Sequence, residues 1–228
     1  MNSLNVSPHP RLYGRRKGRP LHVRKTRLMQ EFLPQVELTL PEDGKLDPYA
    51  LFSPRPDKLW LEIGFGGGEH LAAQAERHPG IGFIGCEPFV NGVASLLDHL
   101  ESKAIKNVRV FANDARLLLD ALPVASAQRI YVLFADPWPK ARHAERRFIG
   151  PDNLPRLARV LAENGELRLA TDDARLADWM LAQMQGCGDF TEIYNDHVPP
   201  GDWLPTRYEQ KAIQAGRRPV YRSYRRKG

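Results

Sequence analysis

Cysteine is scarce in this sequence, and long apolar runs are absent. Cys86 and Cys187 are the only cysteines among 228 residues, and there is no Cys/His cluster of the kind that binds zinc. The sequence therefore excludes a disulfide framework, predicts no metal site, and is typical of reduced thiols in the cytoplasm. No run approaches the roughly 20 apolar residues of a membrane-spanning helix, and the basic N-terminus lacks the apolar stretch of a secretion signal.

Acidic residues are almost missing from both ends of the chain. Residues 1–30 hold eight Lys or Arg and no acid, and residues 207–228 hold eight more with Glu209 as the single acid. These ends contain 16 of the 33 Lys and Arg and 1 of the 27 Asp and Glu, so the remainder carries 17 minus 26 charges, or −9. An acidic centre between basic ends favours nucleic acid as a partner, with solvated basic tails as the alternative.

Proline and glycine separate an N-terminal region from the rest. Residues 1–30 are expected to form a flexible arm that becomes helical near Leu28, and residues 34–56, with five prolines, a connector. We therefore expect an arm and connector over residues 1–56. One domain with a basic C-terminal segment should follow over residues 57–228.

Strands and helices are expected to alternate from Lys58 onward. The expected strands cover 58–63, 81–86, 108–111, 130–135 and 166–170, with a last pair near 190–194 and 220–224. The expected helices cover 69–77, 90–104, 115–122, 152–161 and 174–185. This alternation predicts an α/β fold with a doubly wound, mostly parallel sheet. Right-handed connections then bring the carboxyl ends of the parallel strands to one edge.

A glycine-rich turn, L-E-I-G-F-G-G-G-E, joins the first expected strand to the first helix. Gly64, Gly66 and Gly68 allow a tight turn and close approach of a ligand to the backbone. The dinucleotide pattern G-x-G-x-x-G would need glycine where Glu69 stands, and Glu62 would repel a pyrophosphate. The turn therefore favours a cationic or zwitterionic ligand, and a tight turn without a ligand is the alternative.

Carboxylates follow four successive strands. Glu87 comes after the second strand, where an acid can accept both hydroxyls of a ribose. Asp114, after Asn113, can face an adenine edge or cap the helix that follows. Because Glu62 and Asp136 occupy equivalent places on two further strands, the series predicts a shared pocket.

The segment F-A-D-P-W-P-K ends the fourth strand and leads into the basic run R-H-A-E-R-R. Asp136 thus lies at a strand end, where open α/β sheets bind ligands, and the run after it points to an anionic polymer. Trp138 can stack on a flipped base or pack beside its two prolines. The residues expected to contact RNA are Arg142, His143, Arg146 and Arg147.

Together these motifs resemble the Rossmann-like class I S-adenosylmethionine-dependent methyltransferases, and more narrowly the bacterial tRNA (guanine-N7)-methyltransferase family. The resemblance covers nearly the whole chain and includes E-x-G-x-G-x-G, F-x-D-P-W-x-K-x-R-H-x-x-R-R, A-T-D-D, T-R-Y-E and R-R-K-G-R. Ala135 stands where many members have proline. Glu145 stands where a basic residue is common, which reduces the expected RNA contact slightly.

The resemblance implies methyl transfer from S-adenosylmethionine to N7 of the variable-loop guanosine of tRNA, position 46 in tRNA numbering. We infer no obligate protein partner from the sequence. The implied cofactor-binding residues are Glu62, Gly64, Gly66, Gly68, Glu87, Asn113, Asp114 and Asp136. The implied substrate-binding residues are Lys140, Asp172, Thr206, Arg207, Tyr208 and Glu209. Asp136 is also the implied catalytic residue.

Guanine N7 carries a free lone pair in the neutral base, so no general base has to remove a proton. Most of the acceleration should come from holding N7 in line with the methyl group. We therefore expect Asp136 to orient and to stabilise moving charge rather than to accept a proton. Asp172 and Glu209 can accept hydrogen bonds from guanine N1–H and N2–H₂.

Two other functions compete with this interpretation. A non-catalytic RNA-binding module is disfavoured because all four strand-end acids and the glycine turn are present. An amino-methyltransferase acting on adenine or cytosine usually has a D/N-P-P-[YFW] motif, and the segment that begins at Asp136 lacks the second consecutive proline. Trp60, Trp179 and Trp203 are expected to be packing residues.

Overall fold

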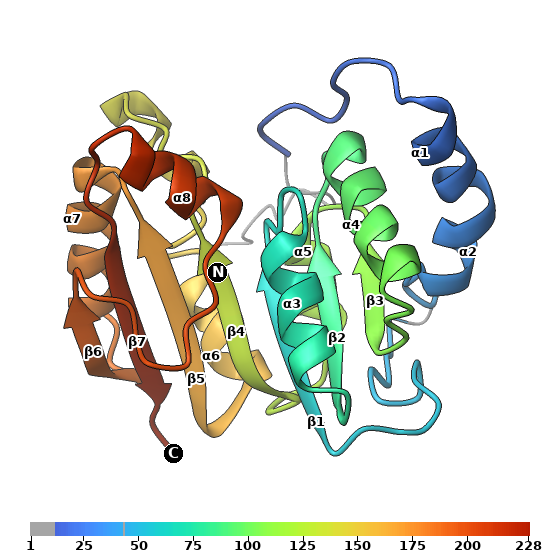
Figure 1. Ribbon diagram of the computed structural model, residues 1–228. Coiled ribbons are helices and arrows are strands. Elements are labelled where there is room, and N and C mark those ends of the chain that lie inside the picture. The colour runs from blue at the N-terminus through green and yellow to red at the C-terminus, as the bar shows by residue number, and fades with distance from the viewer. Residues whose placement is uncertain (1–11, 43) are drawn as a thin grey trace.

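The computed structural model describes residues 12–42 and 44–228. Seven strands form one sheet in the order β3-β2-β1-β4-β5-β7-β6. Strand β7 is antiparallel to β5 and β6, and the other neighbouring strands are parallel. The predicted doubly wound, mostly parallel α/β fold is confirmed (Figure 1). The strands are β1 Lys58–Ile63, β2 Ile81–Cys86, β3 Val108–Phe111, β4 Ala127–Leu133, β5 Leu161–Thr171, β6 Phe190–Asp196 and β7 Val220–Arg226.

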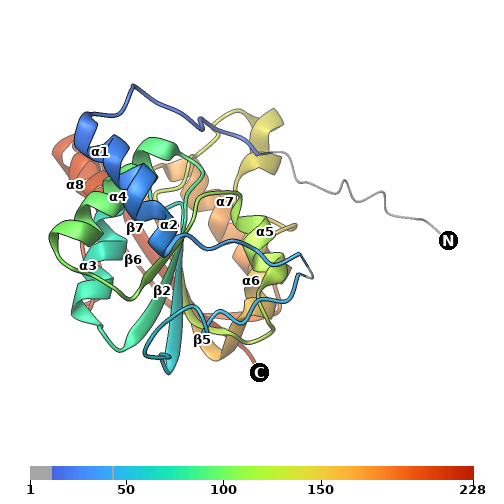
Figure 2. The same ribbon diagram turned by 90° about the vertical axis from the view of Figure 1, so that its right-hand side faces the viewer.

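Helices cover both faces of the sheet (Figure 2). One face carries α3 Glu69–Arg77 and α4 Val90–Ser102, and the other carries α5 Ala115–Ala121, α6 Leu154–Val160 and α7 Ala174–Gln185. The remaining helices are α1 Val23–Arg27, the π-helical η1 Leu28–Phe32, α2 Leu33–Val36, the 3₁₀ segment η2 Ala141–Arg146 and α8 Arg207–Gln214. No helix among residues 12–42 and 44–228 is long and apolar enough to cross a membrane.

The core is divided by the sheet, as the alternation along β1 shows. Leu59, Leu61 and Ile63 pack into the cluster under α5, α6 and α7. Trp60 packs on the opposite face, against α3 and α4. Because side chains alternate along a strand, Glu62 also points to the α3 face. The fold thus directs this acid toward a helix rather than toward solvent.

The observed elements differ from the expected ones in three places. Residues 207–214 form α8, which the alternation of expected strands and helices did not include. The helical N-terminal segment runs from residue 23 to residue 36, so it begins before Leu28 and extends into the expected connector. The ends of β4 and β5 also differ, since β4 covers 127–133 and β5 covers 161–171.

The N-terminal arm is packed on α4 rather than flexible, over the part that the structure describes. The Arg24 Nε atom lies 2.5 Å from the Asp98 carboxylate, and Arg27 lies 2.6 Å from Glu101. Further along the arm, the Gly18 N–H donates to the side chain of Asn91 at 2.8 Å. In Figure 2 the arm, in blue, runs over the upper end of α4 toward η2. Residues 1–11 of the predicted arm lie outside the described residues.

Candidate active site

The four predicted strand-end carboxylates come from neighbouring strands. Glu62 belongs to β1, Glu87 and Asp114 follow β2 and β3, and Asp136 follows β4. These strands are parallel and adjacent in the order β3-β2-β1-β4, so their carboxyl ends form one continuous edge, uppermost in Figure 1. The fold therefore collects the four acids on the edge where open α/β sheets bind ligands.

The glycine-rich turn is tied to the acid after β2. One carboxylate oxygen of Glu87 accepts from the Gly66 N–H at 2.8 Å, and the other accepts from the Phe89 N–H at 3.0 Å. Burial raises the pKa of Glu87, the two N–H donors oppose this rise, and the charge of Asp136 adds to it. The last effect requires Asp136 to lie close to Glu87. The ends of β2 and β4 therefore belong to one electrostatic site.

All three expected glycines adopt the left-handed conformation that favours glycine. The φ angles are +74° at Gly64, +56° at Gly66 and +79° at Gly68. A side chain at Gly68 would meet Leu96 of α4 at 2.6 Å, so this glycine is needed for packing. At Gly64 no atom outside its two chain neighbours lies within 4 Å of where a side chain would begin. The turn is therefore closed against α4 and open at Gly64, where a ligand can approach the backbone.

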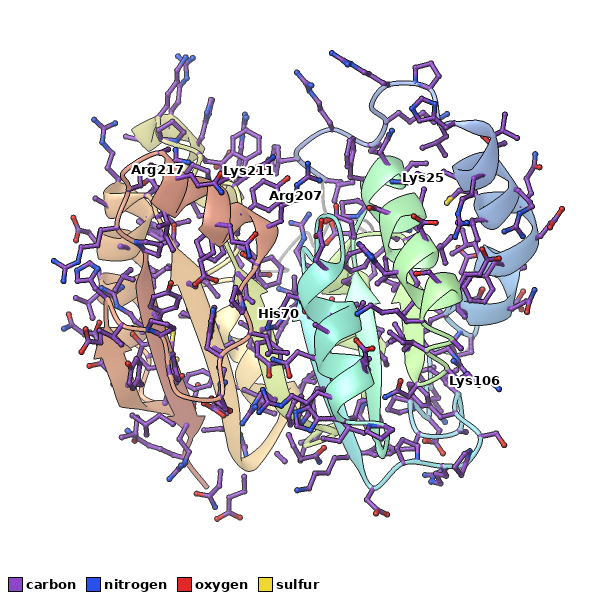
Figure 3. All side chains as sticks on the ribbon, viewed as in Figure 1. Lys25, His70, Lys106, Arg207, Lys211 and Arg217 are labelled. Carbon is purple, nitrogen blue, oxygen red and sulfur yellow. The ribbon has the colours of Figure 1, made fainter. Side chains whose placement is uncertain are left out.

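Glu62 is buried and bonded to a histidine that sequence reasoning missed. Its carboxylate accepts from His70 Nδ1 at 2.7 Å, and His70 Nε2 lies 3.2 Å from the side-chain nitrogen of Gln74. The amide of Gln74 is a donor, so His70 accepts at Nε2 and donates from Nδ1. Polar residues four positions apart on an otherwise apolar helix face were the available signal. His70 lies at the centre of the molecule in Figure 3.

Asp114 caps the helix that follows it, so the capping alternative is confirmed. Its side chain accepts from the Arg116 N–H at 2.9 Å and forms an ion pair with the Arg116 guanidinium at 2.6 Å. The Asn113 side chain accepts from the Asp114 N–H at 2.9 Å. Asp114 is thus held rigidly at the edge, whether or not a ligand also contacts it.

Asp136 differs from the other three acids because it is exposed. Within the described part of the chain, no group donates a hydrogen bond to its carboxylate. Phe134 and Trp138, two residues to either side, have φ angles of +51° and +42°. Non-glycine residues in this conformation cost about 1–3 kcal/mol each and persist only where their surroundings hold them. The loop that carries Asp136 is therefore strained.

A cavity of about 380 Å³ opens beside Asp136. Its walls are residues 134–137 after β4, residues 171–173 at the end of β5, and Tyr208, Lys211 and Arg217. Asp172, expected to bind the substrate, lies in this wall and pairs with Arg217 at 2.8 Å. Lys140 is exposed and is not among the lining residues.

Thr206 and Glu209 form the start of α8 instead of lining the cavity. The two residues make a reciprocal capping box, with bonds of 2.9 Å and 3.0 Å. The buried carboxylate of Glu209 also accepts from the Trp203 indole at 2.9 Å and from the Tyr221 hydroxyl at 2.6 Å. Direct acceptance from guanine by Glu209 does not fit this geometry, because the carboxylate is buried and already bonded to three side-chain or backbone donors.

Arg207 and Tyr208 connect α8 to the glycine-rich turn. The Arg207 guanidinium lies 3.8 Å from the carboxylate of Glu69. The Tyr208 ring would lie 3.2 Å from a side chain added at Gly66. Tyr208 thus contacts the turn and also lines the cavity. Figure 3 shows Arg207 and Lys211 near this upper edge, with Arg217 beyond them.

The basic run after Asp136 divides into exposed and engaged side chains. Arg142 is exposed, whereas the Arg146 guanidinium lies over the rings of Tyr13 and Trp138, at 4.6 Å and 5.1 Å from their centres. Arg147 donates to the backbone carbonyls of Pro137 and Trp138, each at 3.1 Å. The expectation that Arg147 contacts RNA does not fit, because its guanidinium faces the protein.

The aromatic residues expected to pack do so, and Trp138 occupies a surface cluster. Trp60 and Trp203 are buried in the core, and Trp179 packs against its edge. Trp138 is partly buried beside His143, with ring centres 5.9 Å apart. Partial desolvation lowers the pKa of His143, and the nearby positive charges of the basic run lower it further. His143 is thus biased toward its neutral form.

Solved structures with the same fold define the class. A 16S rRNA methyltransferase, KamB, matches with a TM-score of 0.59 and 13% identity over 81% of this chain and 95% of its own. A 16S rRNA (adenine(1408)-N(1))-methyltransferase with cosubstrate SAM, from Catenulisporales acidiphilia, matches with a TM-score of 0.56 and 17% identity over 81% and 93%. The fold is therefore the Rossmann-like α/β fold of class I methyltransferases.

Sequence relatives narrow the class to one family. A family model described as a putative methyltransferase matches residues 56–222. A tRNA (guanine-N(7)-)-methyltransferase of Paramagnetospirillum magneticum is 48% identical over 99% of this chain and 97% of its own. One of Granulibacter bethesdensis is 44% identical over the full length of both chains. The chain belongs to the tRNA (guanine-N(7)-)-methyltransferase family, so the resemblance inferred from the motifs is confirmed.

Proposed function

We propose that this protein transfers a methyl group from S-adenosylmethionine to N7 of the variable-loop guanosine at position 46 of tRNA. The observation that carries the proposal is the cavity in which Asp136 and Asp172 lie together, beside the open glycine-rich turn. The names of the relatives support tRNA as the substrate. A tRNA substrate also favours the cytoplasm as the place of action.

The residues at the ends of β1, β2 and β3 fit S-adenosylmethionine. The open side of Gly64 leaves space for the ligand against the backbone, and Glu62 and Glu87 supply negative charge for a cationic sulfonium and its ammonium group. Each Glu87 oxygen has one lone pair left for a ribose hydroxyl. The cofactor supplies an electrophilic methyl group, which the N7 lone pair attacks.

Asp136 and the cavity wall act on the guanine side. The exposed Asp136 carboxylate is free to stabilise the positive charge that appears on the purine. Asp172 can accept hydrogen bonds from guanine N1–H and N2–H₂, while Arg217 holds this carboxylate in the wall. Thr206 and Glu209 contribute indirectly, because their capping box sets the position of Tyr208. Arg207 belongs to the same helix start.

Exposed basic side chains on the same edge give a surface for the tRNA backbone. These side chains are Arg15, Arg16, Lys17, Arg19, Lys140 and Arg142. The arm passes close to the loop that carries Asp136, since a side chain at Gly14 would lie 3.9 Å from an Asp136 oxygen. Phosphates held by the arm would therefore lie near the cavity that receives the base.

Incubation of the protein with tRNA and labelled S-adenosylmethionine, followed by mapping of the methylated base, tests this function. We expect label at N7 of the guanosine at position 46 and none in a tRNA with another base there. Label on an exocyclic amino group would identify an amino-methyltransferase instead. Tight tRNA binding without any transfer or cofactor binding would identify the non-catalytic RNA-binding module.

A further inference from the structure

Arg147 differs from its neighbours in the basic run because its side chain faces the protein. Its Nε and Nη2 atoms donate to the carbonyl oxygens of Pro137 and Trp138, both at 3.1 Å. Its guanidinium carbon lies 4.9 Å above the ring centre of Trp179, on α7. The Trp179 indole is fixed in turn by donation to the Ile149 carbonyl at 2.6 Å. Arg147 therefore links α7 to the two residues that follow Asp136.

These contacts fall where the backbone is strained. Trp138 has a φ angle of +42°, and Phe134, on the other side of Asp136, has +51°. The strained conformation of Phe134 is stabilised by a hydrogen bond from its N–H to the Ala170 carbonyl, at 2.8 Å. On the Trp138 side, Arg147 supplies two hydrogen bonds from one rigid group.

We propose that Arg147 is a positioning residue, which holds the loop after β4 so that the Asp136 carboxylate faces the cavity. The proposal rests on the catalytic role proposed for Asp136. A guanidinium donates two hydrogen bonds in a fixed fork, and it stacks on an indole; an ammonium group does neither. Charge alone therefore does not replace Arg147.

Arg147→Lys separates this role from an RNA contact because it keeps the positive charge. We expect single-turnover methylation at saturating tRNA and cofactor to fall roughly 10- to 100-fold, as expected when a reacting group is misplaced by about 1 Å. The tRNA dissociation constant should change less than about twofold, since the charge that phosphates attract is retained. Arg175→Lys, an exposed substitution on α7, is the matched control and should leave both quantities unchanged.

A double variant tests whether Arg147 acts through Asp136. General destabilisation by the Arg147 substitution would not give the result expected from such coupling. If Arg147 acts through Asp136, the rate of the Asp136→Asn, Arg147→Lys double variant should stay within about threefold of Asp136→Asn alone, because effects on one shared unit are not additive. Multiplication of the two losses would overturn the proposal. A normal saturated rate with weaker tRNA binding in Arg147→Lys would overturn it as well, and would make Arg147 an RNA contact.

Hydrogen exchange tests the same idea without any activity. In Arg147→Lys we expect the amides of Phe134 and His143, which donate to the Ala170 and Lys140 carbonyls, to exchange faster, while the amides within α7 keep their protection. Unchanged exchange at both of these amides would overturn the positioning role. If the wild-type protein methylated no tRNA, the proposed function would fail, yet this measurement would still decide whether Arg147 holds the loop.

Discussion

The two sides of the strand-end edge are built in opposite ways. On β1, β2 and β3, the carboxylates of Glu62, Glu87 and Asp114 are buried, and each accepts a hydrogen bond from the protein. On β4, Asp136 is exposed, and it accepts no hydrogen bond from the described residues. The first side holds its charges in place through hydrogen bonds, whereas the second places its charge through a strained backbone.

This difference fits the two proposed ligands. A small cofactor can be bound by a preformed site, because its shape and charge are the same at every turnover. A guanine inside tRNA must enter from outside, so the group that acts on it has to stay accessible. Satisfied carboxylates limit the freedom of the cofactor side, while the unsatisfied Asp136 keeps its full capacity for the incoming base.

The largest effect should come from Asp136→Asn, which keeps the shape and removes the charge. If Asp136 acts through its field, the single-turnover methylation rate should fall by roughly a hundredfold or more. Binding of tRNA should be nearly intact, because it is spread over many phosphate contacts. Asp152→Asn, in an exposed loop after η2, is a control that should keep the normal rate. A near-normal rate in Asp136→Asn would remove this residue from the mechanism.

Removal of the Glu87 carboxylate, on the part of the edge proposed to bind the cofactor, should alter cofactor affinity. Glu87→Ala removes an acceptor that holds the glycine turn and is proposed to bind the ribose. Loss of such a charged acceptor costs about 1.5–3 kcal/mol, so S-adenosylmethionine binding measured by calorimetry should weaken roughly ten- to a hundredfold. Glu76→Ala, at the far end of α3, should bind normally. Equal affinities in the two variants would show that the pocket assignment is wrong.

Much of the architecture could be predicted because local patterns agreed with it. The glycine turn, the four strand-end acids and the spacing of strands all follow from short-range rules, and β1, β2 and β3 begin and end as expected. Asp114 was open between two roles from sequence alone. In the structure, Asp114 caps helix α5.

Other parts depend on contacts between distant residues, which no local pattern contains. Glu209 was expected to face guanine, yet its carboxylate meets Trp203 and Tyr221, which approach only when β7 pairs with β5. In the sequence, nothing separates Arg147 from its basic neighbours. It is distinguished only by its contacts in the folded protein, with the Pro137 carbonyl and with the Trp179 ring on α7. The capping box from Thr206 to Glu209 was the one local signal for α8 that the sequence offered.

The pH dependence of cofactor affinity tests the role of Glu87, whose pKa is raised mainly by burial. A raised carboxyl pKa stabilises the folded protein below the ordinary glutamate pKa, and this contribution is lost as pH rises through the folded pKa. Cofactor binding has the opposite trend, because the ribose needs the ionised form. We therefore expect affinity to fall as pH drops, and the fall should begin at a higher pH than for an ordinary glutamate. Glu87→Gln should flatten this dependence; an unchanged slope would assign it to another group.

The arm adds a third region, whose backbone and side chains have separate roles. Its backbone is docked, since the Arg16 carbonyl accepts from the Val90 N–H at 2.9 Å and the Arg19 carbonyl accepts from Asn91 at 2.8 Å. The basic side chains from Arg15 to Arg19 are exposed. Deletion of the whole arm would disturb both roles, so substitutions of side chains give the cleaner test.

The smallest effect should therefore come from replacing Arg15 and Arg16 together with alanine, which leaves the docked backbone in place. Each lost phosphate contact should lower the slope of tRNA affinity against salt by roughly 1, with cofactor affinity and saturated rate unchanged. Lys103 and Lys106, at the opposite edge of the molecule, form the matched pair, and Lys106 lies low in Figure 3. Replacing them removes the same net charge but no contact at the active edge. Equal slopes in the two double variants would show that the arm affects tRNA binding only through its net charge.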